Sequence, residues 1–363
     1  MAPATQDTDR RAQTTLTAVD TPIEVPQAFP MHAGKTHDPV VQLAQLPFLT
    51  QALYVAAKLG IADLLASGPR TNEDLAQDIG AHAPSLYRIL RALAGAGLFE
   101  EVQPRHFALT TMGACLRTDA PDSQRAYAIM YGDPAMWQAM QLLHTVMTGQ
   151  PASEHAWGMK AFQYLGAHPD LAAVFNAGMS DGMRQRSIAI ASYDFSAMNT
   201  VVDVGGNQGR LLATVLQANP ALRGVLFDLP QVVARAHEYL ETAGVAERCG
   251  VVGGDFFQEV PVGGDIYILS TVIHDWEDEP AIQILQSCRR AMTANGRLLL
   301  VERVLPAPNE LSLAVLSDLV MLAIGGRERT EAGYRALLAA ADFDLQTVVP
   351  SESPYCLLEA TPR

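Results

Sequence analysis

VVDVGGNQG, at residues 201–209, is an apolar run that ends in glycines. The apolar part predicts a buried strand, and the glycines let the backbone turn sharply and approach a ligand closely. A helix is predicted directly afterwards, over residues 210–217. Strand, glycine turn and helix in this order are typical of a parallel α/β sheet, in which ligands bind at the carboxyl ends of the strands.

The same alternation continues toward the C-terminus. Further strands are predicted at 224–227, 250–253, 265–270 and 297–302, with helices at 231–242 and 280–292 and a last helix from the cap-like Thr330 to about Ala341. Repeated strand–helix units predict a parallel sheet that is covered on both faces. Two final strands, at 345–349 and 355–359, leave almost no room for a helix between them, so we expect an antiparallel hairpin.

The region before this sheet predicts a different architecture. Residues 40–59 keep a helical period, with Pro47 as a candidate break. Thr71 can cap a helix that ends at Gly80, and Pro84 opens another that stops near Gly95. Two short strands follow, at 98–102 and 106–109. Helix, turn, helix and hairpin in this order indicate a winged helix.

A winged helix raises the question of DNA binding, and the charges argue against it. Between residues 40 and 118 the basic and acidic residues are equal in number, and the whole chain carries a net charge of −14. A module that reads DNA normally has a basic excess. We therefore expect this domain to form a dimer through its apolar helices. A DNA-binding regulator that senses its ligand through the C-terminal domain is the alternative.

Composition places the chain among soluble globular proteins. It has 363 residues, of which 49% are hydrophobic and 18% charged, which is enough for two domains. Its four cysteines form no CxxC pair, so neither disulfides nor zinc are expected. Residues 1–38 lack the apolar core of a signal peptide, and no apolar run is long enough to span a membrane. We expect a mobile tail there and a cytoplasmic protein without membrane contact.

Residues 119–192 are predicted to be mostly helical and are rich in methionine and aromatic residues. Most of these side chains suit a core, and methionine also suits the wall of an irregular pocket for a flat ligand. The chain therefore divides into a tail (1–38), a winged-helix dimerisation domain (39–118), a helical linker and pocket wall (119–192) and the sheet domain (193–363).

Polar side chains gather at the carboxyl edge of the predicted sheet. Asp228 ends a strand about twenty residues beyond the glycines, where a carboxylate can accept hydrogen bonds from two ribose hydroxyls. Asp255 follows another strand, and its alternative role is that of a turn residue. His274 lies just beyond the strand at 265–270. These positions predict a nucleotide-like cofactor site with an imidazole beside it.

The motifs, taken in order, resemble one family. The glycine motif reads Asp-x-Gly-x-x-x-Gly, as in class I S-adenosylmethionine-dependent methyltransferases. From Pro39 onward the chain is similar to the small-molecule O-methyltransferases of the caffeic acid and hydroxyindole O-methyltransferase type, in their bacterial natural-product branch. The similarity rests on the winged helix and on VFNAGM (174–179), VDVGG (202–206), FDLP (227–230), GGDFF (253–257), HDW (274–276), VERVLP (301–306) and GGRERT (325–330).

This resemblance implies a Rossmann-like sheet, an intertwined homodimer, S-adenosyl-L-methionine as cofactor and transfer of its methyl group to a phenolic hydroxyl of a small aromatic natural product. It implies that His274 is the general base, with Glu302 and Glu328 flanking it and fixing its tautomer. The implied cofactor contacts are Asp203, Gly205, Asp228, Leu229, Asp255, Phe256 and Ser270. The implied substrate contacts are Trp137, Phe162, Phe175, Met179, Asp275, Val320 and Met321, although Asp275 also suits a cap for the next helix, against which Trp276 would pack.

The sequence departs from the family pattern at several positions. Asn207 stands where the motif usually has a third glycine, Ser270 stands where plant members carry a lysine, and the segment 321–325 is shorter than in plant members. Hydroxylation or decarboxylation by a relative with this fold, and an N- or S-acceptor, are the alternatives. No metal is expected, because no acidic cluster near His274 in the sequence is spaced like a magnesium site.

Overall fold

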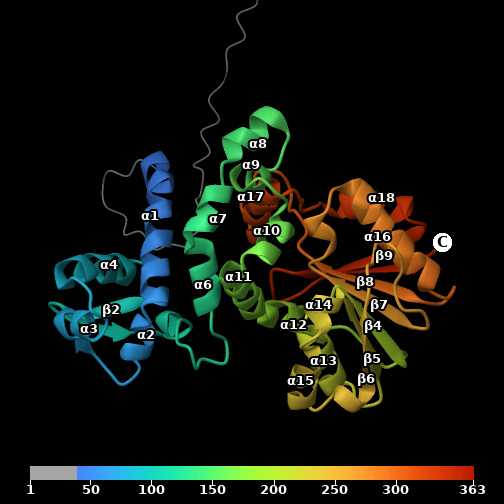
Figure 1. The fold of residues 1–363 in the computed structure, drawn as a ribbon, viewed down its shortest axis with the longest axis horizontal. Coiled ribbons are helices and arrows are strands. Elements are labelled where there is room, and N and C mark those ends of the chain that lie inside the picture. The colour runs from blue at the N-terminus through green and yellow to red at the C-terminus, as the bar shows by residue number, and fades with distance from the viewer. Residues whose placement is uncertain (1–38) are drawn as a thin grey trace, which may run out of the picture.

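The computed structural model describes residues 39–363 (Figure 1). The tail predicted at 1–38 lies outside the described residues. A small N-terminal domain and a larger sheet domain lie at opposite sides of the molecule, with helices α6, α7 and α11 between them (Figure 1).

The N-terminal domain is a winged helix, as predicted. Its three strands pair in the order β1-β3-β2, and both pairings are antiparallel. Thr71 caps α3 by accepting a hydrogen bond from the backbone N–H of Asp74 at 3.0 Å. The break expected at Pro47 does not occur, because α1 continues through it. The elements are α1 Pro39–Lys58, α2 Ile61–Leu64, β1 Arg70–Thr71, α3 Asn72–Asp78, α4 Ala83–Gly95, β2 Phe99–Gln103 and β3 His106–Leu109.

Helix α1 has an unusually apolar surface. By length and composition it is the one helix in residues 39–363 that could cross a membrane, and only 17% of that stretch is buried. Phe48 is 75% exposed, although the rest of the domain packs a core around Ala52, Leu75 and Leu90. A large exposed apolar surface of this kind marks an interface.

The middle of the chain is helical, as predicted for 119–192. Its helices α6 and α11 pack against each other, and α6 also packs against α1. The helices are α5 Thr111–Ala114, α6 Arg125–Gly132, α7 Pro134–Ala139, α8 Leu142–Thr148, α9 Ala152–Trp157, α10 Ala161–Ala167, α11 Pro169–Asp181 and α12 Met183–Ala191.

The sheet domain holds seven strands in the order β6-β5-β4-β7-β8-β10-β9. Strands β4 to β8 run parallel, and β10 is antiparallel to both β8 and β9, which confirms the predicted C-terminal hairpin. The chain moves outward in opposite directions from β4, so a crevice opens where β4 and β7 end. The strands are β4 Thr200–Val204, β5 Arg223–Asp228, β6 Cys249–Gly253, β7 Ile266–Ser270, β8 Arg297–Glu302, β9 Phe343–Pro350 and β10 Cys356–Pro362.

Helices cover both faces of this sheet, and alternate residues of each strand serve the two cores. Val201 packs in the core under α12 and α13, and Val202 packs in the core on the α16 and α18 side. The helix predicted at 231–242 is broken into α14 and α15, and α17 had no counterpart in the prediction. The helices are α13 Arg210–Ala218, α14 Pro230–Val233, α15 Ala236–Thr242, α16 Asp278–Ala291, α17 Leu313–Ile324 and α18 Glu331–Ala340, with short 3-10 turns η1 Ala246–Arg248 and η2 Ile273–Asp275.

Candidate active site

His274 lies in the turn η2, just beyond the carboxyl end of β7. The turn starts with a strained residue, since Thr271 has a φ of +53°, where β-branched side chains are rare. Glu302, the last residue of β8, holds the turn in place. Its Oε1 accepts hydrogen bonds from the backbone N–H groups of Val272 (3.1 Å) and Ile273 (2.9 Å).

The imidazole of His274 is buried among carboxylates. Its Nδ1 lies 3.0 Å from Glu328 Oε1 and 3.9 Å from Glu302 Oε2, and its Nε2 lies 3.5 Å from Asp275 Oδ1. Because an ionised carboxylate only accepts, Nδ1 carries a proton and the neutral ring has its lone pair at Nε2. The expectation that both glutamates orient the ring is corrected in one respect. Glu328 makes the hydrogen bond, whereas Glu302 bonds the backbone.

These carboxylates set the pKa of His274. Burial alone would lower it, but the negative charges of Glu302, Asp275 and Glu328 outweigh burial and raise the pKa to about 9. Burial raises the pKa of Glu302 to about 7. Burial would also raise the pKa of Glu328, but hydrogen bonds from His274 and Ser317 hold it below its usual range. A neighbouring positive charge from a ligand would lower the pKa of His274 again.

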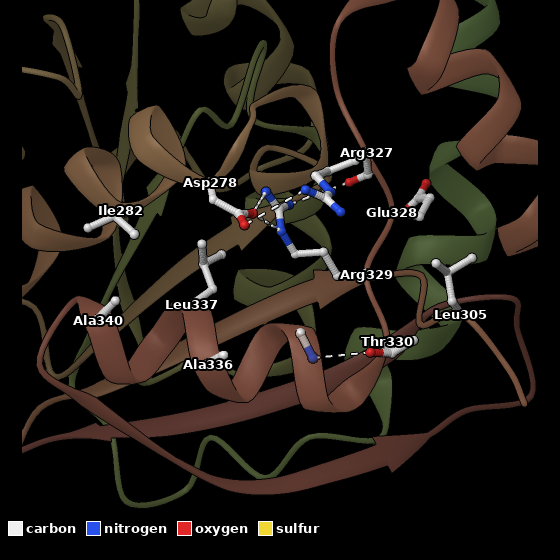
Figure 2. Close-up of a pocket in the computed structure, with 11 residues that line it drawn as sticks. Asp278, Ile282, Leu305, Arg327, Glu328, Arg329, Thr330, Ala336, Leu337 and Ala340 are labelled. Carbon is white, nitrogen blue, oxygen red and sulfur yellow. Dashed lines mark hydrogen bonds and ion pairs between the residues drawn. The ribbon is translucent and has the colours of Figure 1, made fainter. Parts of the chain in front are cut away.

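The segment 326–329 packs against the η2 turn and forms hydrogen bonds to it. The N–H of Arg327 donates to the His274 carbonyl oxygen at 2.8 Å, and a Cβ on Gly326 would collide with that oxygen. Arg329 is buried and donates to the carbonyls of Ile273 (3.2 Å) and Trp276 (2.8 Å). Figure 2 shows its guanidinium joined to Asp278, at 2.8 Å. Sequence reasoning missed Arg329, although the motif at 325–330 contains it.

Side chains of α16 and α18 line a cavity, shown in Figure 2. Its volume is about 380 Å³. Arg327, Glu328 and Arg329 line it, but His274, Gly205 and Asp228 do not. It therefore lies apart from the predicted cofactor residues.

The glycine loop at 205–209 lies beside Val272, which directly precedes the η2 turn. Gly205 has a φ of +72°, and a Cβ there would come within 2.8 Å of Val272 Cγ2 and 3.8 Å of the Phe256 ring. Asn207 has a φ of +54°, which asparagine tolerates better than most residues, so it can replace the expected glycine. The loop is fastened by Asp228, whose Oδ2 accepts from the Asn207 N–H at 2.8 Å.

The second half of the predicted cofactor site borders β5 and β6. Asp228 Oδ1 accepts from the N–H of Leu229 at 2.7 Å, and the Leu229 side chain is 43% exposed. Asp255 Oδ1 accepts from the N–H of Phe257 at 2.9 Å, which is the turn role considered above. The ring of Phe256 meets the edge of Trp276, with centroids 6.1 Å apart. The structure thus brings Phe256 next to both the glycine loop and the His274 turn.

Buried polar atoms without a hydrogen-bond partner gather at the carboxyl ends of β4, β7 and β8. Burial raises the pKa of Asp203 to about 7, the charge of Asp228 adds to this, and Arg186 opposes it. Unpaired buried polar groups are costly, and a water, an ion or a ligand can supply the partner. The atoms are Asp203 Oδ2, Ser270 Oγ, Glu302 Oε2, Glu328 Oε2 and, on α12 nearby, Arg186 Nε.

The predicted substrate residues are only partly brought together. Phe175 and Met179 lie on α11, and Val320 and Met321 on α17, which contacts η2. Trp137 donates its indole N–H to the Tyr131 carbonyl at 2.8 Å. Trp137 lies on α7 and Phe162 on α10, and their role as substrate contacts stays a prediction.

Other side chains near Glu328 were not predicted. Arg303 lies 3.9 Å from Glu328 Oε1, donates to Ser317 at 3.2 Å and lies over the Tyr355 ring at 4.4 Å. Burial and the neighbouring Tyr127 raise the pKa of Tyr131, which lies on α6. Arg303 could have been found from the sequence, because it follows Glu302 directly in the motif at 301–306.

The reason given for expecting no metal is wrong. Ligand atoms of His274, Glu302 and Glu328 lie within 4.8 Å of one another, which is a spacing that could hold an ion. The three residues come from a turn, a strand and a loop, so their spacing in the sequence concealed the cluster. The expectation of metal independence stays a prediction.

Comparison with known families places two domains on the chain. A family described as an O-methyltransferase dimerisation domain matches residues 41–119, and one described as an O-methyltransferase domain matches residues 139–344.

Curated relatives cover most of the chain. A phenazine O-methyltransferase of Lysobacter antibioticus is 46% identical over 317 residues, which cover 87% of this chain and 93% of the relative. An O-demethylpuromycin-O-methyltransferase of Streptomyces alboniger is 41% identical over 86% of each chain. An 8-amino-8-demethylriboflavin N,N-dimethyltransferase of Streptomyces davaonensis is 36% identical over 85% of this chain and 90% of the relative.

Solved structures are similar over the same length. The crystal structure of LaPhzM has a TM-score of 0.84 and 45% identity, covering 90% of this chain and all of that one. CalO1, a methyltransferase in calicheamicin biosynthesis bound to S-adenosylhomocysteine, has a TM-score of 0.82 and 36% identity over 90% and 97%. The O-methyltransferase NcsB1, in complex with S-adenosylmethionine and 2-hydroxy-5-methyl naphthoic acid, has a TM-score of 0.76 and 36% identity over 90% and 100%.

Proposed function

The chain belongs to the O-methyltransferase family that joins a dimerisation domain to a methyltransferase domain, and from this we propose that it methylates a phenolic hydroxyl of a small aromatic natural product. It is an S-adenosyl-L-methionine-dependent methyltransferase, since relatives at high identity are methyltransferases and similar structures hold that cofactor or its product. The hydroxyl, and the role of His274 as its general base, are our proposal.

The residues around the glycine loop fit the cofactor. We assign its nucleoside to Gly205, Asp228, Leu229, Asp255 and Phe256, since they combine a close backbone approach, a carboxylate and an aromatic ring. Asp203 and Ser270 offer unpaired polar atoms to the rest of the molecule. When bound, S-adenosylmethionine supplies a methyl group already activated by a sulfonium. The protein therefore has to orient the acceptor and remove its proton.

The observation that carries the proposal is the hydrogen bond between His274 Nδ1 and Glu328 Oε1, at 3.0 Å. It fixes the tautomer whose Nε2 lone pair can accept a phenolic proton, as in other His–carboxylate pairs. A phenol has a pKa near 10. A histidine pKa of about 9 makes the proton transfer nearly balanced. The imidazolium that results is stabilised by the same three carboxylates.

Phe175 and Met179 on α11 and the apolar helix α17 support a flat acceptor, so Phe175, Met179, Val320 and Met321 are proposed to line its pocket. Asp275, 3.5 Å from His274 Nε2, is proposed to touch the acceptor as well. Trp137 and Phe162 are proposed as further wall residues of this pocket. We also propose the homodimer through α1, the four-part division of the chain given above and a cytoplasmic location.

The test is a mass-spectrometric screen of phenolic natural products with S-adenosylmethionine that carries a deuterated methyl group. A product heavier by one labelled methyl, on oxygen, supports the proposal. One relative is an N,N-dimethyltransferase, so methylation on nitrogen is the second candidate. Fragmentation of the product distinguishes oxygen from nitrogen, and the product mass also excludes or reveals hydroxylation and decarboxylation.

A further inference from the structure

Arg186, on α12, is a buried cation without a carboxylate at salt-bridge distance among the described side chains. Its residue is only 6% exposed. Nη1 donates to Thr271 Oγ1 at 2.7 Å and Nη2 donates to the Met179 carbonyl at 2.9 Å, and both acceptors are neutral. Among the described side chains of residues 39–363, which do not include that of Asp181, no carboxylate oxygen lies within 4.0 Å of its guanidinium, and its Nε has no hydrogen-bond acceptor.

Arg329, the other buried arginine among residues 39–363, and the half-buried Arg303 each have a carboxylate within 4.0 Å. Arg329 has Asp278 at 2.8 Å, and Arg303 has Glu328 at 3.9 Å. Burying a charge is costly unless a counter-ion and hydrogen bonds compensate it. Because guanidinium stays protonated at every physiological pH, Arg186 cannot escape this cost by losing a proton. Asp203 and Glu302 act on this charge from beyond 4.0 Å, so a bound anion is the candidate for a close partner.

The position of Arg186 identifies where such an anion lies. Its partner Thr271 follows Ser270, at the carboxyl end of β7, and Asp203 pairs with β7 two residues earlier in that strand. Burial and Asp228 raise the pKa of Asp203, and Arg186 lowers it, so the two side chains are within electrostatic reach. An unpaired donor, an unpaired hydroxyl and an unpaired carboxylate oxygen thus lie at the two central strand ends.

This set of groups complements a zwitterion. Arg186 offers a donor and a positive charge to a carboxylate, and Asp203 offers an acceptor and a negative charge to an ammonium group. We propose that Arg186 binds the α-carboxylate at the amino-acid end of the cofactor. The assignment rests on the proposed cofactor site and extends it to a residue outside the glycine loop and the strands.

Isothermal titration calorimetry with three nucleosides tests the assignment. S-adenosylhomocysteine has both ends of the amino acid, its decarboxylated form keeps the amine only, and methylthioadenosine has neither. The variants are Arg186→Met and Arg186→Lys. The control is Arg184→Met, which removes an exposed arginine of the same helix, paired only with Asp122.

Arg186→Met is expected to lower the affinity for S-adenosylhomocysteine by about 10- to 100-fold, the range of one charge-assisted hydrogen bond at a buried site. The affinity for the other two nucleosides stays within about twofold. Arg186→Lys should keep part of the preference for S-adenosylhomocysteine over the other two nucleosides, since lysine retains the positive charge but not the planar guanidinium. Arg184→Met changes none of the three affinities.

Equal loss of affinity for all three nucleosides in Arg186→Met overturns the inference, because it indicates a structural role. Unchanged affinity for S-adenosylhomocysteine overturns it as well. The affinities for the three nucleosides are compared within one variant, so a partly folded sample still gives a valid ratio. If Arg186→Met does not fold, Arg186→Lys takes its place. If the wild-type protein binds none of the nucleosides, the proposed cofactor site fails instead.

Discussion

Replacement of Glu328 by glutamine should move the pH dependence of methyl transfer to lower pH and lower its maximum. In the proposed mechanism, only neutral His274 deprotonates the acceptor. Activity should therefore rise with pH through the pKa of that residue, at about 9 before ligands bind. Glu328 supports the protonated ring through a charge-assisted hydrogen bond of 3.0 Å, worth about 1.5–3 kcal/mol. Its loss corresponds to a fall of about one to two pKa units.

The maximum should fall because the tautomer is no longer fixed. A glutamine amide can donate to Nδ1, which places the ring proton on Nε2 and removes the lone pair that accepts the phenolic proton. General base catalysis contributes about 10²- to 10⁴-fold, so the plateau should fall by about 100-fold or more.

The assay is kcat/KM against pH between 6 and 10, with Glu331→Gln as the matched control. Glu331 lies three residues further along and is paired with Arg335 at the surface. Its loss should leave the profile unchanged. An acidic limb of Glu328→Gln at the wild-type pH, together with a plateau within about threefold of the wild type, refutes the reasoning.

Three further predictions follow from other parts of the molecule. Arg329→Met removes the donors to the Ile273 and Trp276 carbonyl oxygens and should lower the free energy of unfolding by about 2–4 kcal/mol, measured by urea titration. The control Arg327→Met, at an exposed side chain, should change the free energy of unfolding little. Equal stability of the two variants contradicts the role of Arg329. Phe48→Asp should shift the protein from dimer to monomer in sedimentation analysis, since this exposed ring on α1 belongs to the dimerisation domain, and a persistent dimer argues against α1 as the interface. Incubation with EDTA should leave activity unchanged, although His274, Glu302 and Glu328 lie close enough together to bind a metal ion. The reason is that Glu302 Oε1 and Glu328 Oε1 already accept hydrogen bonds from the protein. Activity that is lost with EDTA and returns only with added metal contradicts this prediction.

Local patterns predicted much of the fold. The alternation of strands and helices after residue 199 gave each parallel strand to within two residues, because buried parallel strands are continuous apolar runs bounded by turn residues. Helix α17 was missed because it is apolar nearly all round and shows no period of 3.6 residues. The break between α14 and α15 likewise has no proline or glycine to mark it.

Site residues at the ends of strands could be predicted from the sequence. Contacts between side chains that are far apart in the sequence were harder to predict. Asp203 and Asp228 lie at the carboxyl ends of strands that the sequence revealed and His274 lies just beyond another, so their common edge could be inferred. The different roles of Glu302 and Glu328 depend on which carboxylate oxygen reaches the imidazole ring, and the spacing of the two residues in the sequence does not show this. Arg186 was missed for the same reason, since only the folded chain shows a buried guanidinium without a counter-ion.

The central claim is that His274 removes the acceptor's proton beside a cofactor that binds independently of it. Single-turnover methyl transfer by His274→Ala, measured with a phenol found in the screen and combined with calorimetry of S-adenosylhomocysteine, tests it most directly. The account predicts a rate about 10²- to 10⁴-fold lower, with cofactor affinity within about twofold of the wild type. A rate close to the wild type, or a fall in rate matched by an equal loss of cofactor affinity, would contradict it.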